Sequence, residues 1–141
     1  MECIFCAIVS GTLPSHRVYD DEAVTAFLDR SPVTTGHTLV VPRRHAPDIW
    51  SIDGESASAV MRAALTVSKC LRRAFDLSGL NVLQANGALA GQSVFHFHVH
   101  LIPRRVSDGF TPSWHGSHAE ESELESVAHR IRHARESASD E

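Results

Sequence analysis

Residues 91–104 read Gly-Gln-Ser-Val-Phe-His-Phe-His-Val-His-Leu-Ile-Pro-Arg, and no other part of the chain is as informative. His96, His98 and His100 occupy alternate positions, with an apolar residue in each gap. Because successive side chains of a strand point to opposite faces, we expect a strand over residues 94–102 with three imidazoles on one face, spaced about 7 Å apart. A buried polar group without a partner is costly. The pattern therefore predicts a pocket or a metal site on that face.

Three other interpretations of the histidine run compete with a pocket. A half-exposed strand can carry histidines by chance, although the strict register and the neighbouring Gly-Gln-Ser make chance a minor alternative. An expression tag is excluded, because tags are contiguous and terminal and lack alternating aromatic residues. His-x-His can also supply two ligands of a catalytic zinc, and the run by itself leaves that chemistry open.

The bulk properties are those of a single ordinary globular domain. The chain has 141 residues, of which 43% are hydrophobic, and this is enough for one core without disulfides. No apolar run approaches the roughly 20 residues of a membrane span, and the first residues lack the features of a signal peptide. We therefore expect a cytoplasmic protein that does not enter a membrane. The net charge of −4 argues against a general nucleic-acid surface, which would be basic.

The hydrophobic pattern predicts an α+β fold with an antiparallel five-stranded sheet. The expected elements are a short helix at 2–9, strands at 16–20, 23–28 and 37–42, a long helix at 54–75, and strands at 80–85 and 94–102. In the long helix, apolar residues recur at intervals of three and four, with Asp53 as the N-cap. We expect a domain over residues 1–105. Over 106–141 we expect an extension that packs on the same domain through a peripheral helix and ends in a frayed acidic tail.

Cys3-x-x-Cys6 has the spacing of half a structural zinc site. A redox pair and plain packing are the alternatives, although only two residues precede Cys3, whereas a redox motif follows a strand. A tetrahedral zinc needs two more ligands. The candidates are histidines near the ends of predicted strands, first His45 and His96 and then, more weakly, His16 and His37.

The remaining cysteine and the C-terminal histidines have ordinary explanations. Cys70 falls between Val67 and Leu71 in the helical pattern, so we expect a small core residue. His129 and His133 share a helix face in the polar C-terminal third, where we expect solvated side chains.

Together these features resemble the histidine triad (HIT) superfamily, which is defined by the pattern His-φ-His-φ-His-φ-φ with φ apolar. Residues 96–102 match that pattern without departure. The likeness is to the nucleotide-binding, Hint-like branch with an N-terminal Cys-x-x-Cys, and it covers about residues 2–105. Beyond the triad, the segments that carry it are 3–8, 26–29, 36–42 and 91–94.

The resemblance implies a nucleotide hydrolase or transferase. The middle histidine, His98, would attack the α-phosphorus of a nucleotide and form a covalent nucleotidyl-imidazole that water then cleaves, which suits neutral imidazole near pH 7. His100 and His96 would orient it or handle the phosphate, and Asp29 would accept from the ribose hydroxyls. Asn86, Gln92 and Ser93 would donate hydrogen bonds to the phosphate. Gly91 would let the backbone approach the phosphate closely. The wall for the base would consist of Ile4, Phe5, Ile8, Phe27 and Leu28.

Ordinary structural roles remain open for several of these residues. Phe27 and Ile8 could belong to a plain core. Asp29, which stands shortly before Ser31, could simply start a turn, and Gly91 could serve only a turn.

By the same resemblance the chain would bind one structural zinc and form a homodimer. The zinc ligands would be Cys3, Cys6, His45 and His96, which leaves His98 and His100 for the chemistry. A clue to the dimer in the sequence itself is a set of small residues on the long helix, namely Ala59, Ala63, Ala64 and Ala74. They permit close approach of another helix, although small residues can also simply pack within one core.

Two classes of function follow. The first is a hydrolase that acts on purine nucleotide conjugates such as phosphoramidates, acyl-nucleotides or dinucleoside polyphosphates. The second is a nucleotide-binding or adaptor protein whose turnover is incidental. The intact triad favours the enzyme. The chain has no Gly-x-x-x-x-Gly-Lys loop, so we expect binding through base, ribose and α-phosphate rather than through a triphosphate.

Overall fold

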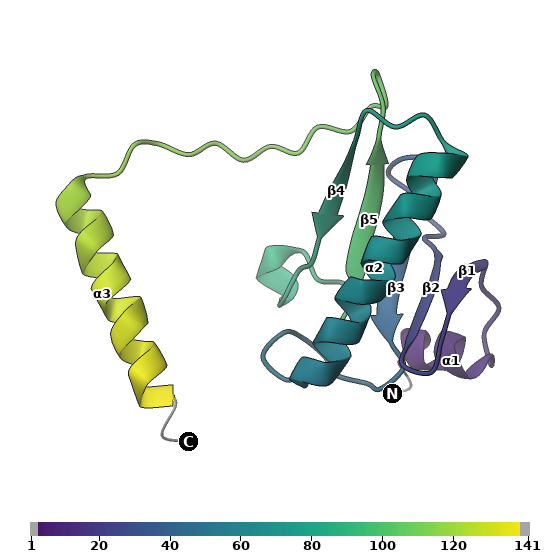
Figure 1. Cartoon of the computed structure of the whole chain (residues 1–141), viewed down its shortest axis with the longest axis horizontal. Helices are drawn as coiled ribbons and strands as arrows, with labels where there is room; N and C mark the ends of the chain where they lie inside the picture. Colours follow the sequence, from purple (N-terminus) through teal and green to yellow (C-terminus); the bar gives the residue numbers. More distant parts are fainter. Residues whose placement is uncertain (1–2, 139–141) are drawn as a thin grey trace. The chain divides into compact units, whose positions relative to one another are not determined.

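The computed structural model describes residues 3–138, which form an α+β fold with an antiparallel five-stranded sheet, as predicted (Figure 1). In chain order the elements are α1 (Ile4–Ser10), β1 (Arg17–Asp20), β2 (Val24–Leu28), β3 (Thr38–Pro42), α2 (Gly54–Ala74), β4 (Gly79–Leu83), a 3₁₀ turn (Ala88–Ala90), β5 (Val99–Arg104) and α3 (Glu121–Ala138). The strand order across the sheet is β1-β2-β3-β5-β4. This order makes β1 and β4 the edge strands. Every neighbouring pair of strands is antiparallel.

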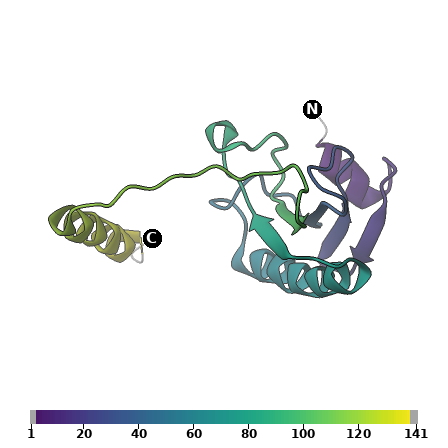
Figure 2. The same ribbon diagram turned by 90° about the horizontal axis from the view of Figure 1, so that it is seen from above.

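The sheet separates two helices of very different length (Figure 2). The long helix α2 runs along one face, and the short helix α1 lies on the other side. Neighbouring residues of β2 and β3 serve these two sides alternately: Ala26 and Val40 pack towards α2, whereas Phe27, Leu39 and Val41 pack towards α1. A shift of one residue would exchange the two sets, so burial on both sides fixes the register.

The helix α2 begins where the sequence predicts. Asp53 accepts a hydrogen bond from the backbone N–H of Ser56 at 2.8 Å, so its assignment as N-cap is confirmed. Ala59, Ala63 and Ala64 are buried in the core between α2 and the sheet. These three alanines therefore pack within one core, which is the alternative that the sequence left open, and they let α2 approach its own sheet.

The expectation for Cys70 is also wrong. The side chain is exposed rather than packed in the core. The buried stripe of α2 follows Val60, Val67 and Leu71, and Cys70 lies beside that stripe near the end of the helix. An α-helix turns once every 3.6 residues, so Cys70, which directly precedes the buried Leu71, points away from the buried face.

The histidine run is only partly a strand. The sequence predicts a strand from residue 94, but β5 begins at Val99, so His96 and His98 precede it and only His100 lies in it. The backbone N–H of Phe97 donates to the carbonyl of Ala46 at 2.7 Å, outside the sheet ladder. The ring centroids of His98 and His100 lie 4.8 Å apart, and His96 lies with Cys3, Cys6 and His45 instead. The prediction of three imidazoles in one row about 7 Å apart is therefore wrong.

The chain divides into two compact units, residues 1–110 and 111–141. The second unit contains α3, on which the apolar side chains of Leu124, Val127 and Ile131 are exposed. The predicted packing of this extension on the domain stays a prediction, and residues 139–141 of the predicted acidic tail lie outside the described residues. Within residues 3–138, no helix combines the length and apolarity needed to cross a membrane.

Candidate active site and metal cluster

A pocket of about 210 Å³, the histidine pocket, opens between α1, the end of β2 and the segment that carries the histidines. One part of its lining is apolar and consists of Ile4, Phe5, Ile8, Pro14, Phe27, Leu28, Leu39 and Val94. The other part is polar and consists of Ser15, Asp29, Arg30, Ser93, His98 and His100. Such a lining suits a ligand with a flat apolar end and a polar or charged end.

The backbone fixes the tautomer of His98 in this pocket. Its ring is 6% exposed, and its Nδ1 lies 2.7 Å from the carbonyl oxygen of His96. Because a carbonyl oxygen only accepts, Nδ1 carries the proton and donates, and the lone pair remains on Nε2. Burial lowers the pKa of His98 below its ordinary value, which keeps the ring neutral near pH 7. The Nε2 atom is therefore equipped to act as a nucleophile.

Beside His98 lies a group that we call the histidine chain, which consists of the hydrogen-bonded pair His37 and His100 together with the nearby carboxylate of Asp29. The backbone N–H of Val33 donates to Nδ1 of His37 at 3.2 Å, so the proton of neutral His37 is on Nε2. That nitrogen donates to Nδ1 of His100 at 2.9 Å and lies 3.6 Å from Oδ2 of Asp29. His100 consequently holds its own proton on Nε2. Burial lowers the pKa of His100 to about 4, so it offers a neutral N–H donor with its ring 4.8 Å from that of His98.

The histidine chain also offers three ligand-type atoms within 4.8 Å of one another, but its hydrogen bonds disfavour a metal. A histidine that binds a metal through one nitrogen donates from its other nitrogen to an acceptor. In His37 that other nitrogen, Nδ1, faces the N–H of Val33, which is a donor. If Nε2 of His37 bound a metal, the proton of the ring would move to Nδ1 and point at the N–H of Val33, which also donates. We therefore interpret this group by its hydrogen bond and not as a metal site.

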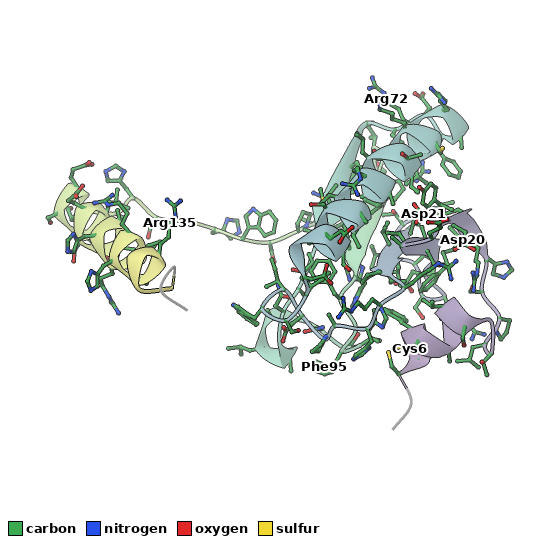
Figure 3. All side chains as sticks on the ribbon, turned by 60° about the horizontal axis from the view of Figure 1, so that its bottom comes forward. Cys6, Asp20, Asp21, Arg72, Phe95 and Arg135 are labelled. Carbon is green, nitrogen blue, oxygen red and sulfur yellow. The ribbon has the colours of Figure 1, made fainter. Side chains whose placement is uncertain are left out.

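A second group, the metal cluster, consists of the four predicted zinc ligands, Cys3, Cys6, His45 and His96. Nδ1 of His96 lies 3.4 Å from Sγ of Cys3, 3.5 Å from Sγ of Cys6 and 3.1 Å from Nδ1 of His45. Cys6 stands in the first turn of α1 (Figure 3). These separations are close to those between neighbouring ligands of a tetrahedral zinc with bonds of roughly 2.0–2.3 Å.

The environment of His96 fits a metal ligand. Its Nε2 lies 2.8 Å from the carbonyl oxygen of Pro42, in the buried interior. Nε2 therefore carries the proton and donates, which leaves the lone pair of Nδ1 directed at the other three members of the metal cluster. Two cysteines and two histidines are a donor set that zinc prefers. His16 and His37, the weaker candidates, do not belong to this cluster.

The comparisons with known proteins agree with this arrangement. The HIT domain family matches residues 10–107 of the chain. The chain belongs to the HIT family. The Bacillus subtilis relative named Protein hit is 43% identical over 132 residues, which are 92% of this chain and 91% of that protein. A crystal structure of a HIT family protein from Bacillus anthracis matches with a TM-score of 0.89 at 42% identity, over 94% of this chain and 96% of that one.

Three further HIT relatives have names that concern chemistry. Adenylylsulfatase HINT3 of Arabidopsis thaliana is 34% identical over 107 residues, which are 76% of this chain and 54% of that protein. A histidine triad nucleotide-binding protein from Candida albicans matches at a TM-score of 0.89 and 27% identity, over 97% of this chain and 99% of that one. A Zn-bound histidine triad family protein from Mycobacterium smegmatis matches at a TM-score of 0.75 and 36% identity, over 83% of this chain and 85% of that one. The HIT family assignment supports a nucleotide-related function.

Nine of the twelve residues predicted to bind the nucleotide line the histidine pocket, and three do not: Asn86, Gly91 and Gln92. Gln92 is buried, and its amide donates to the carbonyls of Pro47 and Val94 while its oxygen accepts from the N–H of Gly87. Both amide hydrogens are therefore engaged within the protein. Gln92 holds the loop next to Ser93 instead of facing the pocket.

Asn86 and Gly91 also serve their loop. Asn86 accepts from the backbone N–H of Ile49 at 2.7 Å and pairs with the side chain of Gln84. Gly91 follows the 3₁₀ turn with φ of +96°, a conformation that favours glycine. The turn that the sequence left open at Gly91 is therefore present, and its approach to a phosphate stays a prediction.

Three of the residues with two open interpretations combine both. Phe27 and Ile8 are buried in the core around α1 and also line the histidine pocket. Asp29 accepts from the backbone N–H of Ser31 at 2.8 Å, as a turn residue does, and lines the pocket as well.

The sequence prediction missed two kinds of residue. The sequence predicts His37 only as a weak zinc candidate, because its contact with His100, 63 positions away, leaves no local signal. The sequence motifs also make no prediction for Arg30, which follows Asp29 directly. It is the one lysine or arginine in the described lining of the histidine pocket, and no hydrogen bond or ion pair engages it within residues 3–138.

Proposed function

We propose that this HIT protein is a hydrolase that cleaves purine nucleotide conjugates at the α-phosphorus through a covalent intermediate on His98. The observation that carries the proposal is the hydrogen bond of 2.7 Å from Nδ1 of His98 to the carbonyl of His96, which leaves the Nε2 lone pair free inside a pocket. The name of the Arabidopsis relative, an adenylylsulfatase, supports the same class of reaction.

The proposed reaction has two steps. Nε2 of His98 forms a bond to the α-phosphorus while the bond from phosphorus to the leaving group breaks, and the leaving group takes a proton from solvent water. The neutral N–H of His100 donates a hydrogen bond to a phosphate oxygen and stabilises the charge that develops there. Water then attacks the phosphorus and gives up a proton to the solvent. The N–P bond breaks, which restores neutral His98 and releases a 5′-mononucleotide. His96 contributes its carbonyl to the orientation of His98 and its side chain to the metal cluster.

The proposed ligand pose follows the division of the lining. The purine occupies the apolar part beside Phe5 and Phe27, the ribose hydroxyls donate to Asp29, and the α-phosphate lies near His98 and Ser93. We assign Asn86, Gly91 and Gln92 to shaping the loop that presents Ser93, because their polar groups are engaged within that loop or form its turns.

In the proposed function the metal cluster holds a structural zinc. Bound there, the ion would cross-link α1 to the segment that carries His96. The name of the Zn-bound Mycobacterium smegmatis protein supports this assignment.

We also propose a homodimer that forms through the outer face of α2 and the edge strand β4. Met61 and Leu65 on α2 are 55% and 56% exposed, and Val82 on β4 is 48% exposed. An edge strand has unpaired backbone groups that a second copy can satisfy. Light scattering should give about twice the monomer mass of 15.4 kDa at micromolar concentration, and the monomer mass would rule the dimer out.

The experiment that tests the function is a leaving-group panel on the purified chain. Adenosine phosphoramidates, acyl-adenylates and diadenosine polyphosphates are offered in parallel, and AMP release is measured for the wild type and for His98→Ala. We expect release from at least one class, abolished in the variant. Tight AMP binding without any release would instead favour the adaptor function.

A further inference from the structure

We propose that the metal cluster and the histidine pocket are thermodynamically coupled, so that metal occupancy regulates nucleotide binding and the orientation of His98. This inference rests on the proposed function. It departs from the sequence expectation of a zinc that serves the fold alone. Two connections between the sites carry it, one through His96 and one through α1.

The first connection is a single residue that serves both sites. The side chain of His96 gives Nδ1 to the metal cluster, and its carbonyl oxygen accepts from Nδ1 of His98 at 2.7 Å. Between them, the N–H of Phe97 donates to the carbonyl of Ala46, the neighbour of the cluster member His45. A shift of His96 on loss of the metal would move the acceptor that fixes the His98 tautomer.

The second connection is the helix α1, which has seven residues. Helices of this length are not stable alone and depend on tertiary anchors. Cys3 is the N-cap, and Cys6 stands in the first turn. The two residues between Cys3 and Cys6, Ile4 and Phe5, both line the histidine pocket.

Phe5 joins the two connections directly. Its ring meets that of His98 edge-on at a centroid distance of 5.1 Å and that of His96 at 6.0 Å. It also packs on Phe27 at 5.4 Å, within the wall proposed for the base. A metal bound to Cys3 and Cys6 would therefore hold Phe5 in place, and Phe5 contacts both His98 and the proposed wall for the base.

Coupling of two binding sites is reciprocal. If the metal orders α1 and His96 for the nucleotide, the nucleotide must tighten metal binding by the same factor. We expect AMP to raise the zinc affinity of the wild-type chain at least about fivefold, the lower end of typical coupling between sites. The same factor should separate the AMP affinities of the zinc-loaded and metal-depleted protein.

The test measures both sides of this relation on the full chain. Zinc affinity is determined by competition with a chromogenic chelator, with and without saturating AMP. AMP affinity is determined by calorimetry with and without zinc. Amide hydrogen exchange in β2 and β3 reports whether the sheet remains folded without the metal. Equal factors of at least fivefold with a protected sheet support the proposal.

A matched pair of variants distinguishes the effect of losing a metal ligand from the effect of losing the N-cap of α1. Cys3→Ser removes a thiolate ligand but keeps a side chain that suits an N-cap, so it should reproduce the AMP affinity of the metal-depleted protein. Cys70→Ser makes the same chemical change at an exposed cysteine outside both sites, and both affinities should match the wild type.

Two results overturn the inference: factors within twofold of one, or loss of sheet protection together with the metal, which would make the linkage a consequence of global unfolding. Failure of the zinc-loaded wild type to bind AMP would count against the proposed function itself. An AMP affinity that is the same with and without zinc would overturn only the coupling.

Discussion

The metal cluster and the histidine chain each bring two histidines together with other side chains of the metal-ligand type at similar separations, yet they suit different chemistry. In the metal cluster, the far nitrogen of His96 donates to the carbonyl of Pro42, so the near nitrogen presents a lone pair to Cys3 and Cys6. In the histidine chain, the far nitrogen of His37 accepts from the N–H of Val33, so the near nitrogen presents a proton. The backbone group behind the ring decides whether a histidine ligates or donates.

The largest expected effect on the rate comes from substitution of His98, the proposed nucleophile, which lies beside the histidine chain. His98→Ala should lower kcat/KM for the best substrate of the panel at least about a thousandfold, because a lost nucleophile removes the covalent route. Mononucleotide binding, measured by calorimetry, serves as the control for folding. A variant that keeps more than about a tenth of the rate would rule out this role, since that is only about 1.4 kcal/mol of barrier.

The contrast between the two groups predicts one metal site per chain. Metal-depleted protein titrated with zinc should bind one equivalent, and Cys3→Ser should abolish it and lower the melting temperature. His37→Ala should leave the stoichiometry at one. A second tight equivalent that disappears in His37→Ala would show that the argument from the Val33 N–H is wrong.

A smaller effect is expected when the histidine chain is cut. His37→Ala removes the donor that holds Nδ1 of His100. Because a neutral hydrogen bond contributes about 0.5–1.5 kcal/mol, kcat should fall by up to roughly tenfold. His37→Gln keeps an N–H donor near the position of Nε2 and should recover part of that loss. Equal rates for the two variants would contradict a role through His100.

The smallest expected effect is on the pH dependence of stability. Burial lowers the pKa of His100 from 6.5 to about 4, helped by the neighbouring rings of His98 and His37 and opposed by Asp29. Between these values the unfolded chain binds a proton at this position and the folded chain does not, so the free energy of unfolding falls as the pH drops from 7 towards 4.

The variant His100→Gln lacks this group, so its melting temperature should fall less between pH 7 and pH 5 than that of the wild type. Thermal melts at the two pH values measure the difference. A wild-type curve as flat as that of the variant would mean that His100 is not buried in neutral form.

Much of this protein follows from its sequence alone. The apolar runs within 23–28 and 37–42 predict strands, and the repeat over 54–75 predicts the long helix with its cap at Asp53, because these signals depend on local geometry. The run at 96–102 carries the family, and the spacing of Cys3 and Cys6 indicates a metal.

Only the tertiary structure decided which ring nitrogen of each histidine carries the proton. The tautomer of His98 depends on a carbonyl two residues away, that of His96 on Pro42 and that of His37 on Val33, and none of these contacts has a sequence period. The strand prediction over 94–102 was too long because hydrogen bonds outside the ladder hold residues 96–98. Side-chain type and spacing set which groups can meet, whereas the direction of each hydrogen bond depends on how the folded backbone turns its groups towards the ring, whether they are near in sequence, as for His98, or distant, as for His96.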